Sequence, residues 1–241
     1  MPHTPLDITV LGCGNSVGVP SLGCTCPTCM STDPKNTRTR ASIFVQSPTT
    51  SVLIDAGPDM RQQLLNNNLS TADAVVFTHA HADHINGADD IRNFNRLNDD
   101  WVTIYGNALC LYEFSTRFDY MFNAPRVEGV WYKPCLLAQK IDHMQPFTVG
   151  DIDFLPIEVM HGTMQVLGFR MGDFAYVTDC NHISEESLDA LKGVKNLIID
   201  CVTYHIDFPY PTHSDLHNTM KWLDVIQPEQ AYFTHMSHKF E

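Results

Sequence analysis

Residues 77–87 read FTHAHADHING, a short stretch that places His79, His81, Asp83 and His84 close together. Because successive side chains of an extended segment point to opposite sides, His79 and His81 lie on the same side. Three imidazoles and a carboxylate are more ligands than one tetrahedral ion with an open coordination position needs. The stretch therefore predicts two metal ions side by side. The alternative is a polar loop with solvated histidines.

Four candidate ligands come at the ends of apolar runs that are typical of strands. They are His79, His161, Asp179 and His235. Functional groups in sheet-based folds gather outside the carboxyl ends of strands, where the rigid backbone directs side chains into one crevice. We therefore expect these four residues, from four separate strands, to converge on one site.

Expected strands and helices alternate along the chain. Runs rich in Val, Ile, Phe and Tyr predict strands at residues 7–12, 50–57, 72–79, 152–161, 174–179, 196–200 and 230–235. The alternation with helices indicates an α/β class. A chain of 241 residues fits one domain of this class, which we expect to cover residues 1–241.

Three stretches between the expected strands predict helices. They cover residues 58–67, 184–193 and 214–228. Pro58 suits the first position of the first helix, and Ser184 suits the cap of the second. In the third helix, Leu216, Met220 and Leu223 are expected along one buried face.

The pattern H-x-H-x-D-H after an apolar strand resembles the signature of the metallo-β-lactamase superfamily. His161, Asp179 and His235 follow in the order of that family's remaining metal ligands, so the resemblance covers essentially the whole chain. It implies a four-layer αββα sandwich with a dinuclear site at one edge. The cofactors expected there are two divalent ions, Mn or Zn, because histidine and carboxylate ligands suit these metals.

The resemblance also implies a role for each candidate ligand. One ion is expected to be bound by His79, His81 and His161, and the other by Asp83, His84 and His235. Asp179 is expected to bridge the ions together with a hydroxide, so Asp179 and Asp83 are catalytic candidates. Asp55, in VLIDAG, matches an aspartate that supports the ligands without binding metal. The alternative for Asp55 is a turn at a strand end.

Cys24, Cys26 and Cys29 form a C-x-C-x-x-C pattern that supplies three thiolates. A closed structural zinc site needs a fourth ligand, for which we propose His238. A link between distant parts of the chain would keep the C-terminal segment from fraying. The alternatives are a redox cluster or free thiols, with His238 exposed. The scattered cysteines are expected to be buried as small hydrophobic residues: Cys13, Cys110, Cys135, Cys180 and Cys201.

Three further motifs indicate one group within the superfamily. They are the stretch GNSVGVPSLGCTCPTC, the closing H-x-x-H and FDYMF at residues 118–122. Together they look like the phosphoribosyl cyclic phosphodiesterases of the carbon–phosphorus lyase pathway and their relatives. These relatives share their core with tRNA 3′-processing nucleases but lack the long substrate arm. The resemblance implies a homodimer. It also implies that His213 donates a proton to the leaving group or holds the phosphate. The alternative is that His213 only packs at a helix start.

Gly12, Gly14 and Gly18 miss the dinucleotide-binding fingerprint by one residue, and no P-loop lysine follows. We therefore expect a tight loop beside the metal site. Asn15 and Ser16 in this loop are candidates for hydrogen bonds to a substrate phosphate. No motif includes the remaining isolated histidines, for which surface or packing roles are expected: His3, His143, His182 and His205.

The formal net charge is −13, and basic residues form no run. Such a field repels polyanions, which argues against a long nucleic-acid track. The first residues, MPHTPLDITVLGCG, lack the pattern of a signal peptide, and no apolar run is long enough to span a membrane. The sequence thus predicts a cytoplasmic protein that is not associated with membranes.

These observations predict a phosphodiesterase with two metal ions that acts on a small phosphodiester, either cyclic phosphoribosyl or nucleotide-like. The first alternative is an RNA-processing nuclease of the tRNA 3′-end type. Hydrolysis of a thioester or lactam would use the same ions. A non-catalytic protein that binds metal or nucleotide is the remaining alternative.

Overall fold

Two facing β-sheets form the centre of the computed structural model, which describes residues 5–122, 130–204 and 210–240. The first sheet has the strand order β1-β2-β3-β4-β5-β6. Its strands are β1 (Asp7–Gly12), β2 (Ser42–Gln46), β3 (Ser51–Ile54), β4 (Ala74–Val76), β5 (Val102–Gly106) and β6 (Leu136–Lys140). His3 and His205 lie outside the described residues.

The second sheet has the order β11-β8-β9-β10-β12-β13, and β7 pairs with β8. Its strands are β7 (Phe147–Val149), β8 (Ile152–His161), β9 (Met164–Met171), β10 (Phe174–Val177), β11 (His182–Ile183), β12 (Asn196–Asp200) and β13 (Gln230–Thr234). The strands expected from the sequence are all present, several of them shorter by a few residues. The sequence did not predict β2, β5, β6, β7, β9 and β11.

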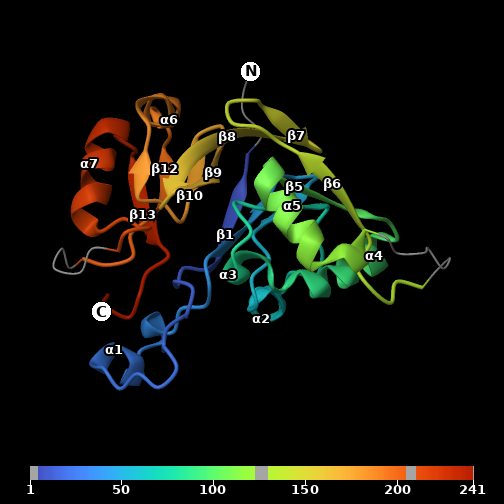
Figure 1. Ribbon diagram of the computed structural model, residues 1–241, viewed down its shortest axis with the longest axis horizontal. Helices are drawn as coiled ribbons and strands as arrows, with labels where there is room; N and C mark the ends of the chain where they lie inside the picture. The colour runs from blue at the N-terminus through green and yellow to red at the C-terminus, as the bar shows by residue number, and fades with distance from the viewer. Residues whose placement is uncertain (1–4, 123–129, 205–209, 241) are drawn as a thin grey trace.

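Helices cover the outer faces of both sheets (Figure 1). On the first sheet lie α2 (Met60–Asn66), α3 (Ala82–Ile85), α4 (Arg92–Asn98) and α5 (Ala108–Arg117), and on the second α6 (Glu185–Leu191) and α7 (Leu216–Ile226). The short α1 (Pro27–Met30) lies apart from the sandwich, near the C-terminal segment. Short 3-10 turns occupy Pro34–Asn36, Ala88–Ile91 and Asp119–Met121. The predicted four-layer αββα sandwich is thus confirmed.

Alternation of side chains along the strands supplies the cores between these layers. In β2, Ile43 and Val45 face the other sheet, whereas Phe44 faces the helices. In β3, Leu53 likewise packs under the helices, and Ile54 packs between the sheets. Strands with both faces buried read as continuous apolar runs, which is the pattern that predicted β3, β4 and β10.

Two helix predictions need correction. Pro58 precedes α2, which begins at Met60 after Asp59. The carboxylate of Asp59 binds the backbone N–H and the guanidinium of Arg40 and does not cap α2. In α7, Met220 is 46% exposed, and the fully buried residues are instead Thr219 and Ile226. Ser184 caps α6 as expected, by accepting a hydrogen bond from the backbone N–H of Ser187.

The parallel strands position the functional side chains. β3 runs parallel to β4, and β12 runs parallel to both β10 and β13. Carboxyl ends of neighbouring parallel strands meet at one edge of a sheet, so the loops that follow them come together there.

Among the residues that the structure describes, no helix is long and apolar enough to cross a membrane.

Candidate functional site

The candidate ligands converge in two adjacent groups. In one group the donor atoms of His79, His81 and His161 all lie within 4.8 Å of one another. The donor atoms of the other group satisfy the same limit, and this group comprises Asp83, His84, Asp179 and His235. His79 and His81 come from the loop between β4 and α3, whereas His161 ends β8. The structure thus brings together every residue that the sequence proposed as a ligand of the pair of ions.

Asp179 lies between the two groups. One carboxylate oxygen, Oδ2, is 3.8 Å from Nε2 of His79 and 3.3 Å from Nε2 of His235. The other oxygen, Oδ1, is 3.3 Å from Nε2 of His84. A single carboxylate therefore faces histidines of both groups, as a bridging ligand must.

Left-handed backbone turns follow three of the strands. Asp55, Asp179 and His235 have φ values of 64°, 50° and 56°. This region costs an L-residue roughly 1–2 kcal/mol, and such strain clusters at functional sites. Each of these residues comes immediately after a strand or one residue later, where the turn directs its side chain into the shared crevice.

Two glycines allow the loops of the site to pack closely. A Cβ on Gly57 would lie 2.1 Å from the carbonyl oxygen of Asp83, and one on Gly87 would lie 2.0 Å from that of Gly57. The backbone N–H of Ala56 donates to the carbonyl of His84 at 2.7 Å. The absence of side chains at these glycines therefore lets α3, with Asp83 and His84, rest directly on the end of β3.

Hydrogen bonds fix which nitrogen of each histidine carries the proton. Nδ1 of His84 lies 2.8 Å from Oδ2 of Asp55, and a carboxylate can only accept. Nδ1 of His161 donates to the carbonyl of Thr212 at 2.7 Å for the same reason. Thr78 donates its hydroxyl to Asp55 and so accepts from Nδ1 of His79 at 2.9 Å. The lone pairs of the three Nε2 atoms are therefore available to a metal ion.

The buried ring nitrogens and carboxylates of the site form a donor set that suits divalent ions. Nε2 of His79 and Nε2 of His84 are buried without a hydrogen-bond partner. Such an atom costs free energy unless something satisfies it. The carboxylates of Asp83 and Asp179 share the same space, and imidazole with carboxylate is a donor set that suits Zn and Mn. Metal ions at this point would satisfy the lone pairs and neutralise the acids.

The pKa shifts of the candidate histidines agree with a role as metal ligands. Burial holds the pKa of His79 well below its usual value, and nearby His84 adds to the effect. Burial also lowers the pKa values of His81 and His161, so these imidazoles stay neutral, as metal binding requires. Burial alone would lower the pKa of His84, but Asp179 and Asp55 raise it well above its usual value. The surrounding acids thus favour a positive charge beside Nε2 of His84, which a metal ion supplies.

His213 lies at the rim of the site and is oriented by Asp200. Its Nδ1 lies 3.1 Å from Oδ2 of Asp200, and its ring stacks on that of His235 with centroids 4.4 Å apart. Burial opposes protonation, yet the hydrogen bond and charge of Asp200 raise the pKa of His213. Asp200 is fully buried and also accepts from the backbone N–H of Cys180 at 2.9 Å.

Asp200 belongs to none of the motifs from which the sequence predicted functional residues. Asp200 is the last residue of the run NLIID, so it has the same position at a strand end as the predicted ligands. That position is the signal that could have identified it.

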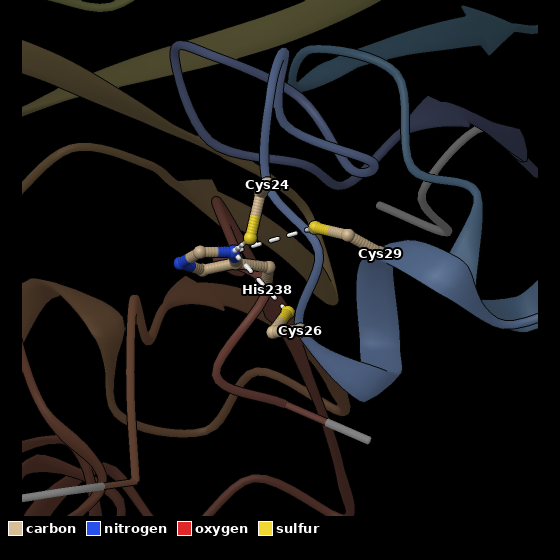
Figure 2. A group of neighbouring side chains, drawn as sticks. All are labelled: Cys24, Cys26, Cys29 and His238. Carbon is tan, nitrogen blue, oxygen red and sulfur yellow. Dashed lines mark hydrogen bonds between the residues drawn. The ribbon is translucent and has the colours of Figure 1, made fainter.

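The second predicted cluster is also assembled (Figure 2). Nδ1 of His238 lies 3.1 Å from Sγ of Cys24, 3.6 Å from Sγ of Cys26 and 3.3 Å from Sγ of Cys29. Around a tetrahedral zinc ion, the usual Zn–S and Zn–N lengths place sulfur and nitrogen about 3.6 Å apart. The four donor atoms all lie within 4.8 Å of one another, so they fit one ion.

The remaining cysteines differ in how deeply they are buried. Cys110, Cys135, Cys180 and Cys201 are buried, as expected. Cys13 is only partly buried, because it lies in the glycine-rich loop beside the C-terminal segment.

A family model for the beta-lactamase superfamily domain matches residues 50–236. The chain belongs to the beta-lactamase superfamily. A crystal structure described as a new diphosphatase from the PhnP family is 35% identical, with a TM-score of 0.88 over 98% of this chain and 89% of that chain. Human short-form tRNase Z shares the fold at 14% identity, with a TM-score of 0.71 over 97% of this chain and 94% of that chain.

An octanoyltransferase of Porphyromonas gingivalis is 32% identical over 95% of this chain but only 45% of its own length. The chain thus spans less than half of this curated relative. The 35% identity to the PhnP-family structure, over 89% of that chain, places this superfamily member in the PhnP family.

The glycine-rich loop of this superfamily member packs against the C-terminal segment. The backbone N–H of Asn15 donates to the carbonyl of Met236 at 3.1 Å, and its side-chain Oδ1 is buried without a partner. Ser16 is exposed, and its carbonyl accepts from Nε of Arg40 at 3.2 Å. Substrate binding by Asn15 and Ser16 stays a prediction. His143 accepts from the backbone N–H of Glu158 and has the packing role expected for it.

Proposed function

We propose that this hydrolase is a phosphodiesterase that uses two divalent ions, Mn or Zn, to open a small phosphodiester of cyclic phosphoribosyl or nucleotide-like type. The observation that supports this most directly is the carboxylate of Asp179, which lies 3.8 Å from His79 and 3.3 Å from His235. This arrangement would hold two ions close together. Paired ions supply a nucleophile at neutral pH and clamp the oxygens of an in-line displacement at phosphorus.

The chain's own residues would divide the remaining tasks. The first ion would be held by His79, His81 and His161, the second by Asp83, His84 and His235, and both by Asp179. Asp55 would fix the ring of His84, since it accepts from Nδ1. In the same way the Cys24, Cys26, Cys29 and His238 cluster would hold one structural zinc ion.

His213 would protonate the leaving group. Asp200 accepts from its Nδ1, which directs Nε2 away from Asp200. Asp200 also raises the pKa of His213 and so favours the protonated ring, in which Nε2 carries a hydrogen as well as Nδ1. Cleavage of a phosphodiester leaves an alkoxide that needs such a proton. Asn15 and Ser16 would offer hydrogen bonds to the phosphate from the adjacent loop.

The net charge of −13 supports a small substrate over an extended nucleic acid, because such a field repels a polyanion. A cytoplasmic homodimer remains part of the proposal. A second candidate reaction is hydrolysis of a diphosphate. The 35% identical relative is described as a diphosphatase, and the same displacement at phosphorus would cleave a phosphoanhydride.

The test compares three substrates with Mn²⁺-reconstituted protein at equal enzyme concentration. They are a phosphoribosyl cyclic phosphate, a nucleotide diphosphate derivative and a precursor tRNA. Ring opening that is lost in Asp179→Ala but retained in the exposed-site control Asp142→Ala supports the proposal. Fast cleavage of the diphosphate alone selects the second candidate. Cleaved RNA with both small substrates intact would refute both.

A further inference from the structure

A buried arginine holds the segment that supplies one histidine to each proposed metal site. Arg38 is only 7% exposed, and a guanidinium has five N–H donors. All five donors are used. Nη1 donates to the carbonyls of Ser237 at 3.0 Å and Phe240 at 3.2 Å. Nη2 donates to the carbonyl of Phe240 at 3.2 Å and to Oδ1 of Asn36 at 2.9 Å. Nε donates to the carbonyl of Lys35 at 3.2 Å.

Every acceptor around Arg38 is a neutral oxygen. Burying a guanidinium costs free energy, which here is offset by hydrogen bonds to carbonyl and amide groups. A neutral apolar side chain would fill the same space without that cost. An arginine at this position is therefore better explained by the geometry that its planar, forked donors impose on residues 237–240.

The backbone before Ser237 is fixed as well. The N–H of Met236 donates to the carbonyl of Cys13 at 2.8 Å, and the N–H of Ser237 donates to the carbonyl of Val202 at 3.0 Å. These contacts place the peptide groups directly after His235. The bond from Arg38 to the Ser237 carbonyl then fixes the peptide that leads into His238.

The two histidines diverge across this short segment. Nε2 of His235 lies 3.3 Å from Asp179, whereas Nδ1 of His238 lies 3.1 Å from Sγ of Cys24. A rotation or slip of the segment between them would withdraw both rings together. Figure 2 shows His238 reaching the three thiols from the C-terminal segment, while Cys29 comes from α1.

We propose that Arg38 is a positioning residue that fixes residues 235–240, so that His235 and His238 reach separate metal sites and ion binding at the two sites is coupled. This inference rests on the proposed function of both sites. Its alternative is that Arg38 stabilises the fold without any effect on ion binding.

Arg170 provides a matched control. It also binds carbonyl oxygens, with Nε donating to Gly172 at 3.0 Å and Nη1 to Ala190 at 2.6 Å and Lys192 at 2.9 Å. These acceptors lie at the C-terminal end of α6 and in the turn between β9 and β10, and none of them belongs to either ligand group. Arg38→Met removes five hydrogen bonds and Arg170→Met three of the same type, but only the first affects the segment with the ligands.

The experiment measures ion binding directly. Cobalt added to metal-free protein gives a thiolate-to-cobalt absorption band that reports on the cysteine cluster. Electron paramagnetic resonance of Mn²⁺, added after the cluster is filled with Zn²⁺, reports on the histidine and aspartate site.

In Arg38→Met we expect a weaker cobalt band and a roughly tenfold or greater loss of Mn²⁺ affinity, because residues that orient ligands typically contribute this much. The Mn²⁺ affinity of Arg38→Lys should lie between those of Arg38→Met and the wild type, since one ammonium cannot span the Ser237 and Phe240 carbonyls as the forked guanidinium does. Low concentrations of guanidinium ion should restore part of the loss in Arg38→Met, and Arg170→Met should bind ions like the wild type.

Equal ion affinities in Arg38→Met and Arg170→Met would overturn the inference, even if both proteins melted earlier. If Arg38→Met does not fold, the ion affinities of Arg38→Lys and Arg170→Lys are compared instead. A lower affinity in Arg38→Lys alone supports the inference, and equal affinities overturn it. A wild-type protein whose histidine and aspartate site binds neither Mn²⁺ nor Zn²⁺ would overturn the proposed function and this inference together. Normal wild-type binding without a specific effect of Arg38 would overturn only the inference.

Discussion

Asp55 offers the sharpest test of how the site is built, through the substitution Asp55→Asn. The carboxylate is fully buried and accepts from the backbone N–H of Thr78 at 2.9 Å, the hydroxyl of Thr78 at 2.9 Å and Nδ1 of His84 at 2.8 Å. Asparagine has nearly the same shape. However, it replaces one accepting oxygen with an NH₂ group that can only donate.

One of the three donors must then face another donor. His84 can avoid this conflict by moving its proton from Nδ1 to Nε2. That proton would point at Asp83 and Asp179, each 3.3 Å from Nε2, and would occupy the lone pair that a metal ion needs. The substitution would thus act on the metal through the tautomer of His84.

The expected magnitude follows from these contacts. Loss of a partner that orients a ligand lowers metal affinity by about 10- to 100-fold, which is about 1.4–2.7 kcal/mol. Each charged hydrogen bond lost in a buried site contributes about 1.5–3 kcal/mol, so the free energy of unfolding should also fall by a few kcal/mol.

The assay is Mn²⁺ titration of metal-free protein, followed by urea denaturation. Asp73→Asn is the control, because Asp73 also accepts two hydrogen bonds, from the backbone and hydroxyl of Ser51, but is exposed. We expect both ions to bind the control normally and one to bind Asp55→Asn weakly. Equal Mn²⁺ affinities in the two variants would refute the tautomer argument.

Two further predictions concern the rim and the C-terminal segment. Asp200→Asn should lower kcat by roughly 100-fold with little change in KM, since it removes the group that orients His213 for proton transfer; a change confined to KM would contradict this role. His238→Ala should lower the free energy of unfolding of zinc-loaded protein by several kcal/mol, because the cluster closes a loop of 214 residues and chain entropy alone gives an upper limit of about 5 kcal/mol. Urea midpoints equal to those of His143→Ala would show that no such tether exists.

The sequence predicted that the candidate ligands converge, because their positions follow from strand geometry. His161, Asp179 and His235 each come at the end of an apolar run. β10 and β13 are parallel to β12, and β8 runs in the same direction as β10 because both are antiparallel to β9, so these ends lie at one edge of the sheet. Asp200 obeys the same rule, but an aspartate at a strand end is also common in ordinary turns. Only its contacts with His213 and Cys180 distinguish it.

Other features depended on contacts that leave no pattern in the sequence. Arg38 binds carbonyl groups about 200 residues away, and any residue type can supply a carbonyl. β9 was not predicted because Gly168 interrupts its apolar run; a Cβ there would lie 2.9 Å from the carbonyl of Tyr176. Met220 was wrongly assigned to the buried face of α7, whereas Leu223 does pack against the core. That face centres on Thr219, whose hydroxyl donates to the carbonyl of Asp200 at 2.8 Å.

The position of His235 and His238 in the chain has a consequence for biosynthesis. A ribosome makes proteins from the N-terminus, so both histidines emerge after every strand that the structure describes and after all the other candidate ligands. A nascent chain can therefore form both sheets and gather six ligands of the proposed active centre while both metal sites still lack a histidine. Activity would begin only when these last histidines arrive, which would prevent a partly made chain from hydrolysing substrate.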